Sequence, residues 1–111
     1  MESFPIQLEI YRRANGKRPF VDWVTNLDPA SEAAIVRRLD RVRSGNLGDY
    51  KSVGKGVFEL RVNWGPGYRV YFGRDGGRLV IVLAGGDKSS QSSDITLAQR
   101  YWMEYGNHRT L

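Results

Sequence analysis

Three basic side chains in the second half of the sequence have the types and spacing to act on a phosphate group. Arg61 and Arg69 lie in two successive runs where apolar and polar residues alternate, and Lys88 follows the apolar run after them. A guanidinium group stays cationic and can hold two phosphate oxygens at once. These side chains therefore suit the stabilisation of negative charge on a phosphate, with the lysine as a further cation.

The alternation assigns both arginines to one face of a sheet. Residues 57–63 and 68–72 each alternate between apolar and polar side chains, as in a strand with one buried face. Arg61 and Arg69 fall on the polar side of these strands. The next run, residues 79–84, is apolar without interruption and is typical of an interior strand covered on both faces.

Other segments predict the elements that hold these strands. A clean alternation over residues 6–11 predicts a first strand. Two amphipathic helices are expected to begin at Pro19 and at Pro29, because proline is tolerated in the first helical turn. A last helix follows the serine-rich stretch 89–94, and Gly106 is expected to end it.

The order of these elements predicts a small α+β domain. Strands joined by short turns pair antiparallel, so we expect a sheet of about four strands in the order β-α-α-β-β-β-α, with helices packed on one face. The first strand can return beside the apolar strand, in either orientation. Residues 46–56 are expected to form an irregular connection. Residues 1–106 are expected to form a single domain, and 107–111 a flexible tail.

Composition narrows the classes of partner and site. Seventeen Lys and Arg against twelve Asp and Glu give a net charge of +5, which attracts polyanions or an acidic protein segment. With one histidine and no cysteine, we expect no metal site and no cofactor. No apolar run approaches the roughly 18 residues that span a membrane, and the N-terminus lacks the features of a secretory signal. A cytoplasmic location is favoured.

Three motifs taken together resemble a known family. They are Lys55–Arg61, Tyr68–Phe72 and the segment Gly85–Gln91 at the end of the apolar run. As a set they resemble the RelE/ParE superfamily of bacterial toxins, most of all its HigB-type, phage-derived "addiction module killer protein" branch. The resemblance covers nearly the whole chain. It implies a compact sheet with a basic concave face, and the toxin of a type II toxin–antitoxin pair.

The resemblance also implies an activity and partners. Toxins of this kind cleave messenger RNA positioned on the ribosome, without a metal, and so inhibit translation. A cognate antitoxin, a helix-turn-helix protein in related pairs, neutralises the toxin in a toxin–antitoxin hetero-oligomer. By the resemblance, Arg61 contacts the scissile phosphate, Arg69 lies beside it on the next strand, and Lys55 and Lys88 flank the site as further catalytic cations.

Further substrate contacts are expected from Tyr71 and Gln91. Arg37 and Arg41, on the polar face of the second helix, are expected to bind RNA phosphates; the alternative is a helix face that is merely solvated. Related toxins often place a proton-transferring His or Tyr near the C-terminus. The one histidine here, His108, falls in the predicted tail, so the resemblance assigns no general acid.

Two other functions stay open at this point. A ParE-like inhibitor of DNA gyrase needs no residues that cleave phosphate, and a degenerate toxin kept for binding or regulation needs none either. The plain structural alternative is that Arg61 and Arg69 are sheet residues paired with Glu59 or Asp75. RNA cleavage by the neighbouring 2′-hydroxyl needs only orientation, two proton transfers and charge stabilisation, which two arginines and a lysine can supply in part.

Overall fold

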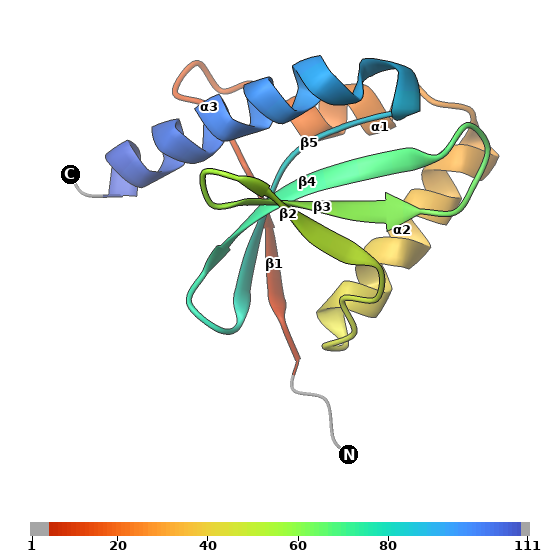
Figure 1. Cartoon of the computed structure of the whole chain (residues 1–111), viewed down its shortest axis with the longest axis horizontal. Coiled ribbons are helices and arrows are strands. Elements are labelled where there is room, and N and C mark those ends of the chain that lie inside the picture. The colour runs from red at the N-terminus through yellow and green to blue at the C-terminus, as the bar shows by residue number, and fades with distance from the viewer. Residues whose placement is uncertain (1–4, 110–111) are drawn as a thin grey trace.

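A five-stranded sheet lies at the centre of the computed structural model, which describes residues 5–109 (Figure 1). The elements in chain order are β1 (Gln7–Ile10), α1 (Pro19–Val24), α2 (Pro29–Arg43), β2 (Tyr50–Gly54), β3 (Val57–Val62), β4 (Tyr68–Asp75), β5 (Leu79–Gly86), the 3₁₀ turn η1 (Lys88–Ser90) and α3 (Gln91–Arg109). This arrangement confirms the predicted α+β class. In the same described part, no helix is both long and apolar enough to cross a membrane.

The strands are ordered β1-β5-β4-β3-β2 across the sheet. β1 pairs with β5 in parallel, and the other neighbours pair antiparallel. The return of the first strand beside the apolar strand is thus confirmed, and its orientation is parallel. β5 has a neighbour on each side, and residues 80–84 are all buried, as predicted for an interior strand.

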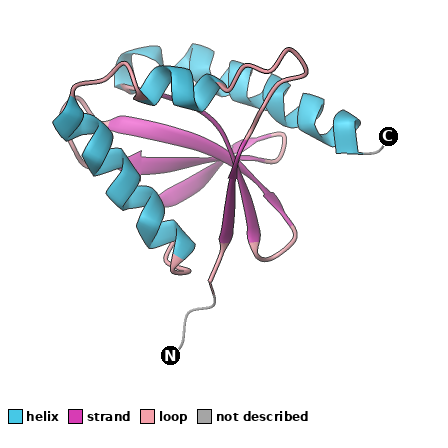
Figure 2. Ribbon diagram, turned by 180° about the vertical axis from the view of Figure 1, so that it is seen from behind, coloured by secondary structure: helices cyan, strands magenta, loops and turns pink. Residues whose placement is uncertain are grey.

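Helices cover both faces of the sheet, which corrects the expectation of a single helical face. α1 and α2 pack on the face that carries Val70 and Phe72, whereas α3 packs on the face that carries Tyr71 and Leu83. The reason is that β4 and β5 have apolar side chains on both faces, so each face needs a cover. In Figure 2, α2 lies along one side of the strands and α3 crosses above them.

Two glycines in the strands let helices approach closely. A Cβ at Gly73 would lie 2.3 Å from the ring of Trp102 on α3, and a Cβ at Gly85 would lie 2.3 Å from the ring of Trp23 on α1. Each indole therefore rests directly on strand backbone. The contact at Gly73 holds α3 against β4, and the contact at Gly85 holds α1 against β5.

β2 is an edge strand that the sequence did not reveal. It was expected to be part of an irregular connection, but it forms a hairpin with β3 through a turn at Lys55, whose φ is +55°. Most β2 side chains are exposed, so the strand carries no alternation of apolar and polar residues. The sheet therefore has five strands instead of about four.

α3 is longer than the sequence suggested. It continues past Gly106 to Arg109, because Gly106 keeps a negative φ and does not take the left-handed conformation that ends many helices. The predicted tail, 107–111, is thus helical at residues 107–109, and residues 110–111 lie outside the described part of the chain.

Candidate functional site

Arg61 on β3 and Arg69 on β4 are direct register partners, so the predicted sharing of one sheet face is confirmed. The carboxylate of Glu59 lies between them and is completely buried. One of its oxygens is 3.2 Å from Nε of Arg69 and 3.7 Å from Nε of Arg61. We call Glu59, Arg61 and Arg69 the arginine pair site.

The two arginines differ in how freely they can reach a ligand. The Arg69 side chain is 12% exposed, and its Nη1 also donates a hydrogen bond to the backbone oxygen of Gly67. The Arg61 side chain is 43% exposed, and its other ion pair, with Asp49, is long at 3.9 Å. Arg69 is therefore held in place by Glu59, while Arg61 has a guanidinium group open to solvent.

Gln91 and Lys88 complete this end of the sheet. Gln91, the first residue of α3, donates a hydrogen bond from Nε2 to the second carboxylate oxygen of Glu59 at 2.8 Å. Lys88 is exposed and follows two residues after Gly86, the register partner of Arg69 on β5. The side chain of Asp87 accepts the backbone N–H of Ser89 and so begins the turn that carries Lys88.

Two residues expected to contact a ligand at the site are not positioned to do so. Tyr71 is completely buried beneath it, and its hydroxyl has no hydrogen-bond partner within the described residues. Burial first, and then the charge of Glu59, raise the pKa of Tyr71. Lys55 occupies the turn at the opposite end of β3, six residues from Arg61 and so about 20 Å along the strand. The structure does not bring Lys55 to the arginine pair site.

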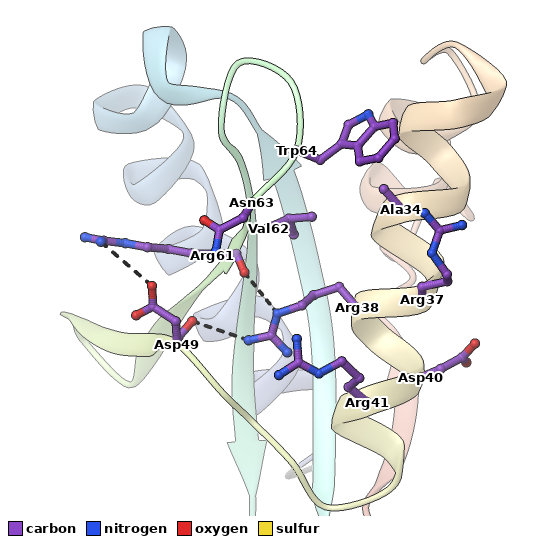
Figure 3. A pocket seen from close by; sticks show the side chains of 10 residues that line it. All are labelled: Ala34, Arg37, Arg38, Asp40, Arg41, Asp49, Arg61, Val62, Asn63 and Trp64. Atoms are coloured by element: carbon purple, nitrogen blue, oxygen red, sulfur yellow. Dashed lines mark hydrogen bonds and ion pairs between the residues drawn. The ribbon is translucent and has the colours of Figure 1, made fainter.

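A second feature, a cavity of about 640 Å³, opens between α2 and the end of β3 (Figure 3). We call it the basic hollow; its lining residues are Ala34, Arg37, Arg38, Asp40, Arg41, Asp49, Arg61, Val62, Asn63 and Trp64. Both helix arginines expected to bind substrate, Arg37 and Arg41, line this hollow. The side chain of Arg61 points away from α2 (Figure 3).

Arg38 is a residue of the basic hollow that the sequence analysis missed. It is 7% exposed, and its guanidinium group donates to the backbone oxygens of Arg61 at 3.0 Å and Leu47 at 2.5 Å. Its spacing could have revealed this burial, since Arg38 lies three residues after Ile35 and four before Val42 on the apolar side of α2.

Neither a cluster of metal-ligating side chains nor a histidine side chain is present in the described part of the chain. No group of three or more His, Cys, Asp or Glu side chains that could hold a metal ion occurs there. The backbone at His108 belongs to α3, but its side chain lies outside the described residues. Arg61 gives the arginine pair site an exposed cation, and Lys88 is exposed on the turn that follows Gly86, the register partner of Arg69.

Sequence comparisons with known proteins show the family of the chain. Residues 22–102 match the family described as "Phage derived protein Gp49-like (DUF891)". A protein of Haemophilus influenzae described as an "Uncharacterized protein" is 47% identical over 88 residues, which cover 78% of this chain and 89% of that relative. The matched segment includes α2, the arginine pair site and most of α3. The chain thus belongs to the phage-derived Gp49-like family, a family associated with RelE-like addiction-module toxins.

Proposed function

We propose that the chain is the HigB-type toxin of a type II toxin–antitoxin pair and cleaves messenger RNA positioned on the ribosome. The association of its family with addiction-module toxins supports this assignment. The observation that carries it is the pairing of Arg61 with Arg69 over one buried carboxylate, which leaves Arg61 43% exposed. Glu59 neutralises one arginine, so the site keeps positive charge for a phosphate.

The proposed chemistry uses the substrate's own nucleophile. The 2′-oxygen of a ribose forms a bond to the adjacent phosphorus, and the bond from phosphorus to the 5′-oxygen breaks. A proton leaves the 2′-hydroxyl, and another reaches the departing 5′-oxygen. Arg61 and Lys88 stabilise the charge that builds on the phosphate oxygens during this exchange. Arg69 acts as a positioning residue, because Glu59 holds it and Gln91 holds Glu59.

The two proton transfers are assigned to water or to groups of the ribosome. A lysine acting as a base near pH 7 needs a pKa about 3 units below its ordinary value, which costs about 4 kcal/mol. Lys88 is exposed, and we propose that it acts as a cation and not as a base. Cleavage is therefore expected to be fast only on the ribosome.

The proposal includes a protein partner and a compartment. Toxin–antitoxin membership implies a cognate antitoxin, which we propose to be a helix-turn-helix protein that forms a hetero-oligomer with this chain in the cytoplasm. Net positive charge suits an acidic antitoxin segment as well as RNA.

Induced expression without the antitoxin tests the function. We expect incorporation of labelled amino acids to fall within minutes while the supercoiling of a reporter plasmid stays unchanged. Loss of supercoiling with continued translation would instead identify a gyrase inhibitor. Normal growth with full-length soluble protein would identify a degenerate toxin. Co-expression with a cognate helix-turn-helix antitoxin is expected to restore translation.

A further inference from the structure

The guanidinium group of Arg38 is buried without a matching negative charge. No ion pair joins it to a carboxylate among residues 5–107, and its Nη1 has neither solvent contact nor a hydrogen-bond partner there. Its other nitrogens bond only to backbone oxygens. Because a buried charge is costly unless it is paired, an anion brought to Arg38 gains more than one brought to an exposed arginine.

Arg41 lies close to Arg38 in the basic hollow. The terminal nitrogens of Arg38 and Arg41 both lie within 3.2 Å of the point where a Cβ at Gly48 would sit. Burial first, and then the charge of Arg41, lower the pKa of Arg38, and the charge of Asp49 opposes them in part. The side chain of Arg41 is exposed and makes no hydrogen bond or ion pair in the described part, so it can turn to share an anion with Arg38.

Within the described residues, the two acidic residues of the basic hollow do not form ion pairs with Arg38 or Arg41. Asp40 is ion-paired with Arg43 at 2.9 Å and points away from Arg38 and Arg41 (Figure 3). Asp49 directs its carboxylate to Arg61 at 3.9 Å and offers Arg38 only its backbone oxygen, at 3.5 Å. Neither carboxylate forms an ion pair with Arg38 or Arg41 in the described part, so the two guanidinium groups keep positive charge for an external oxyanion, which the exposed Arg41 can meet first.

An aromatic ring stands at the rim of the same hollow. Trp64 is 42% exposed, and its Nε1 donates a hydrogen bond to the hydroxyl of Ser31 at 3.2 Å, which fixes one edge of the indole. Exposed aromatic faces beside arginines bind single-stranded nucleic acid, because bases stack on the ring while cations hold the backbone.

We propose that the basic hollow binds one nucleotide of the RNA substrate next to the cleaved one, with its phosphate between Arg38 and Arg41 and its base on Trp64. This proposal rests on the proposed function, which supplies RNA as the substrate. Asp49 lies between the basic hollow and the arginine pair site, because its carboxylate is paired with Arg61 and its backbone oxygen accepts a hydrogen bond from Arg38. One RNA strand can therefore pass from the hollow, over this edge of the sheet, to the arginine pair site.

RNA fits these features better than an acidic peptide. Two adjacent guanidinium groups match the several oxygens of a phosphodiester, and the exposed indole of Trp64 on the same hollow offers a surface on which a base can stack, whereas a peptide carboxylate makes no use of it. The cavity of about 640 Å³ is also of the size that holds a small organic ligand such as a nucleotide.

Binding of an RNA that cannot be cleaved tests the hollow apart from catalysis. The probe is a fluorescein-labelled 2′-O-methyl oligonucleotide, in which the attacking hydroxyl is blocked, and anisotropy is recorded over a series of salt concentrations with the full chain. Arg41→Gln is expected to weaken binding about tenfold and to reduce the slope of log K against log salt by about 0.7. The matched control, Arg100→Gln, removes the same charge from an exposed position on α3 and is expected to change neither value appreciably.

Trp64→Leu separates stacking from charge. It is expected to weaken binding about tenfold with an unchanged salt slope, because stacking releases no counterions. Thermal unfolding of each variant checks that the fold is kept.

Two results would overturn the proposal. One is an equal loss of RNA binding in Arg41→Gln and Arg100→Gln. The other is competition by poly-L-glutamate as strong as by RNA of equal charge, with Trp64→Leu neutral; this would mark the hollow as a site for an acidic protein segment. If the proposed function fails, cleavage is absent while these binding differences persist, so the two failures are distinguishable.

Discussion

The completely buried carboxylate of Glu59 accepts a hydrogen bond from Nε of Arg69 at 3.2 Å. Placing both charges away from water is costly, and the pair is tolerated because Gln91 and Arg61 also contact this carboxylate. Glu59 thereby sets the positions of residues from β3, β4 and α3. The carboxylate that Arg61 and Arg69 share explains how the two arginines can lie side by side despite their mutual repulsion.

Replacement of Glu59 by Gln tests this role. Glu59→Gln leaves the charge of Arg69 buried without a counterion, and we expect it to lower the free energy of unfolding by about 3 kcal/mol. Urea unfolding measures the change. Glu9→Gln, on the exposed side of β1, is the control and should cost at most about 0.5 kcal/mol. Equal effects of the two variants would show that Glu59 does not hold the site together.

The unpaired hydroxyl of Tyr71 predicts an unusual substitution. Tyr71→Phe removes a buried polar group that makes no hydrogen bond in the described part, so stability should stay the same or rise by up to about 1 kcal/mol. RNA cleavage should also persist, because the side chain is out of reach of a substrate. Tyr11→Phe, which removes a 2.8 Å hydrogen bond to Glu104, should instead destabilise by about 1 kcal/mol. Lost cleavage in a folded Tyr71→Phe variant would restore Tyr71 as a substrate contact.

The continuation of α3 past Gly106 can be tested by a stabilising change. A Cβ at Gly106 meets no atom within 4 Å, and alanine is the better helix former. Gly106→Ala should therefore raise the free energy of unfolding by about 0.5–1 kcal/mol, measured by urea unfolding. Destabilisation would place the end of the helix at Gly106, as the sequence alone suggested.

The N-cap of α2 predicts a pH dependence. Hydrogen bonds from Ser31 lower the pKa of Asp28 below its ordinary value of 3.8. Since the folded-state pKa is the lower one, Asp28 stabilises the fold above its ordinary pKa, and this contribution is lost as the pH falls through the folded value. Asn caps a helix as well as Asp but does not titrate. The stability of the unaltered chain should thus fall more than that of Asp28→Asn between about pH 5 and pH 3, and parallel losses in urea unfolding would contradict this.

Local patterns predicted most of the elements. The starts of α1 and α2 at prolines, and the N-cap at Asp28, are confirmed because these signals act within one helical turn. The second helical layer and β2 were missed for another reason. Which face α3 covers depends on contacts between segments far apart in sequence, such as Trp102 on Gly73, and an exposed edge strand carries little apolar signal.

The sequence likewise predicted only part of the arginine pair site. Strand alternation placed Arg61 and Arg69 on one face correctly. It could not show that Glu59 is completely buried, or that a hairpin turn carries Lys55 to the far end of β3. Those facts follow from three-dimensional packing, and they change the roles proposed for the residues. We therefore propose that Arg61 and Lys88, without Lys55, stabilise the charge.

The central claim is tested most directly by mapping the 5′ ends of cellular RNA after brief induction of the unaltered chain and of Arg61→Gln, Lys88→Gln and Lys55→Gln. We expect new 5′ ends within coding regions for the unaltered chain and for Lys55→Gln. Arg61→Gln and Lys88→Gln, at equal protein levels, should reduce them by about a hundredfold, as expected when a group that stabilises transition-state charge is lost. No new 5′ ends with the unaltered chain, or equal cleavage by Arg61→Gln, would contradict the account.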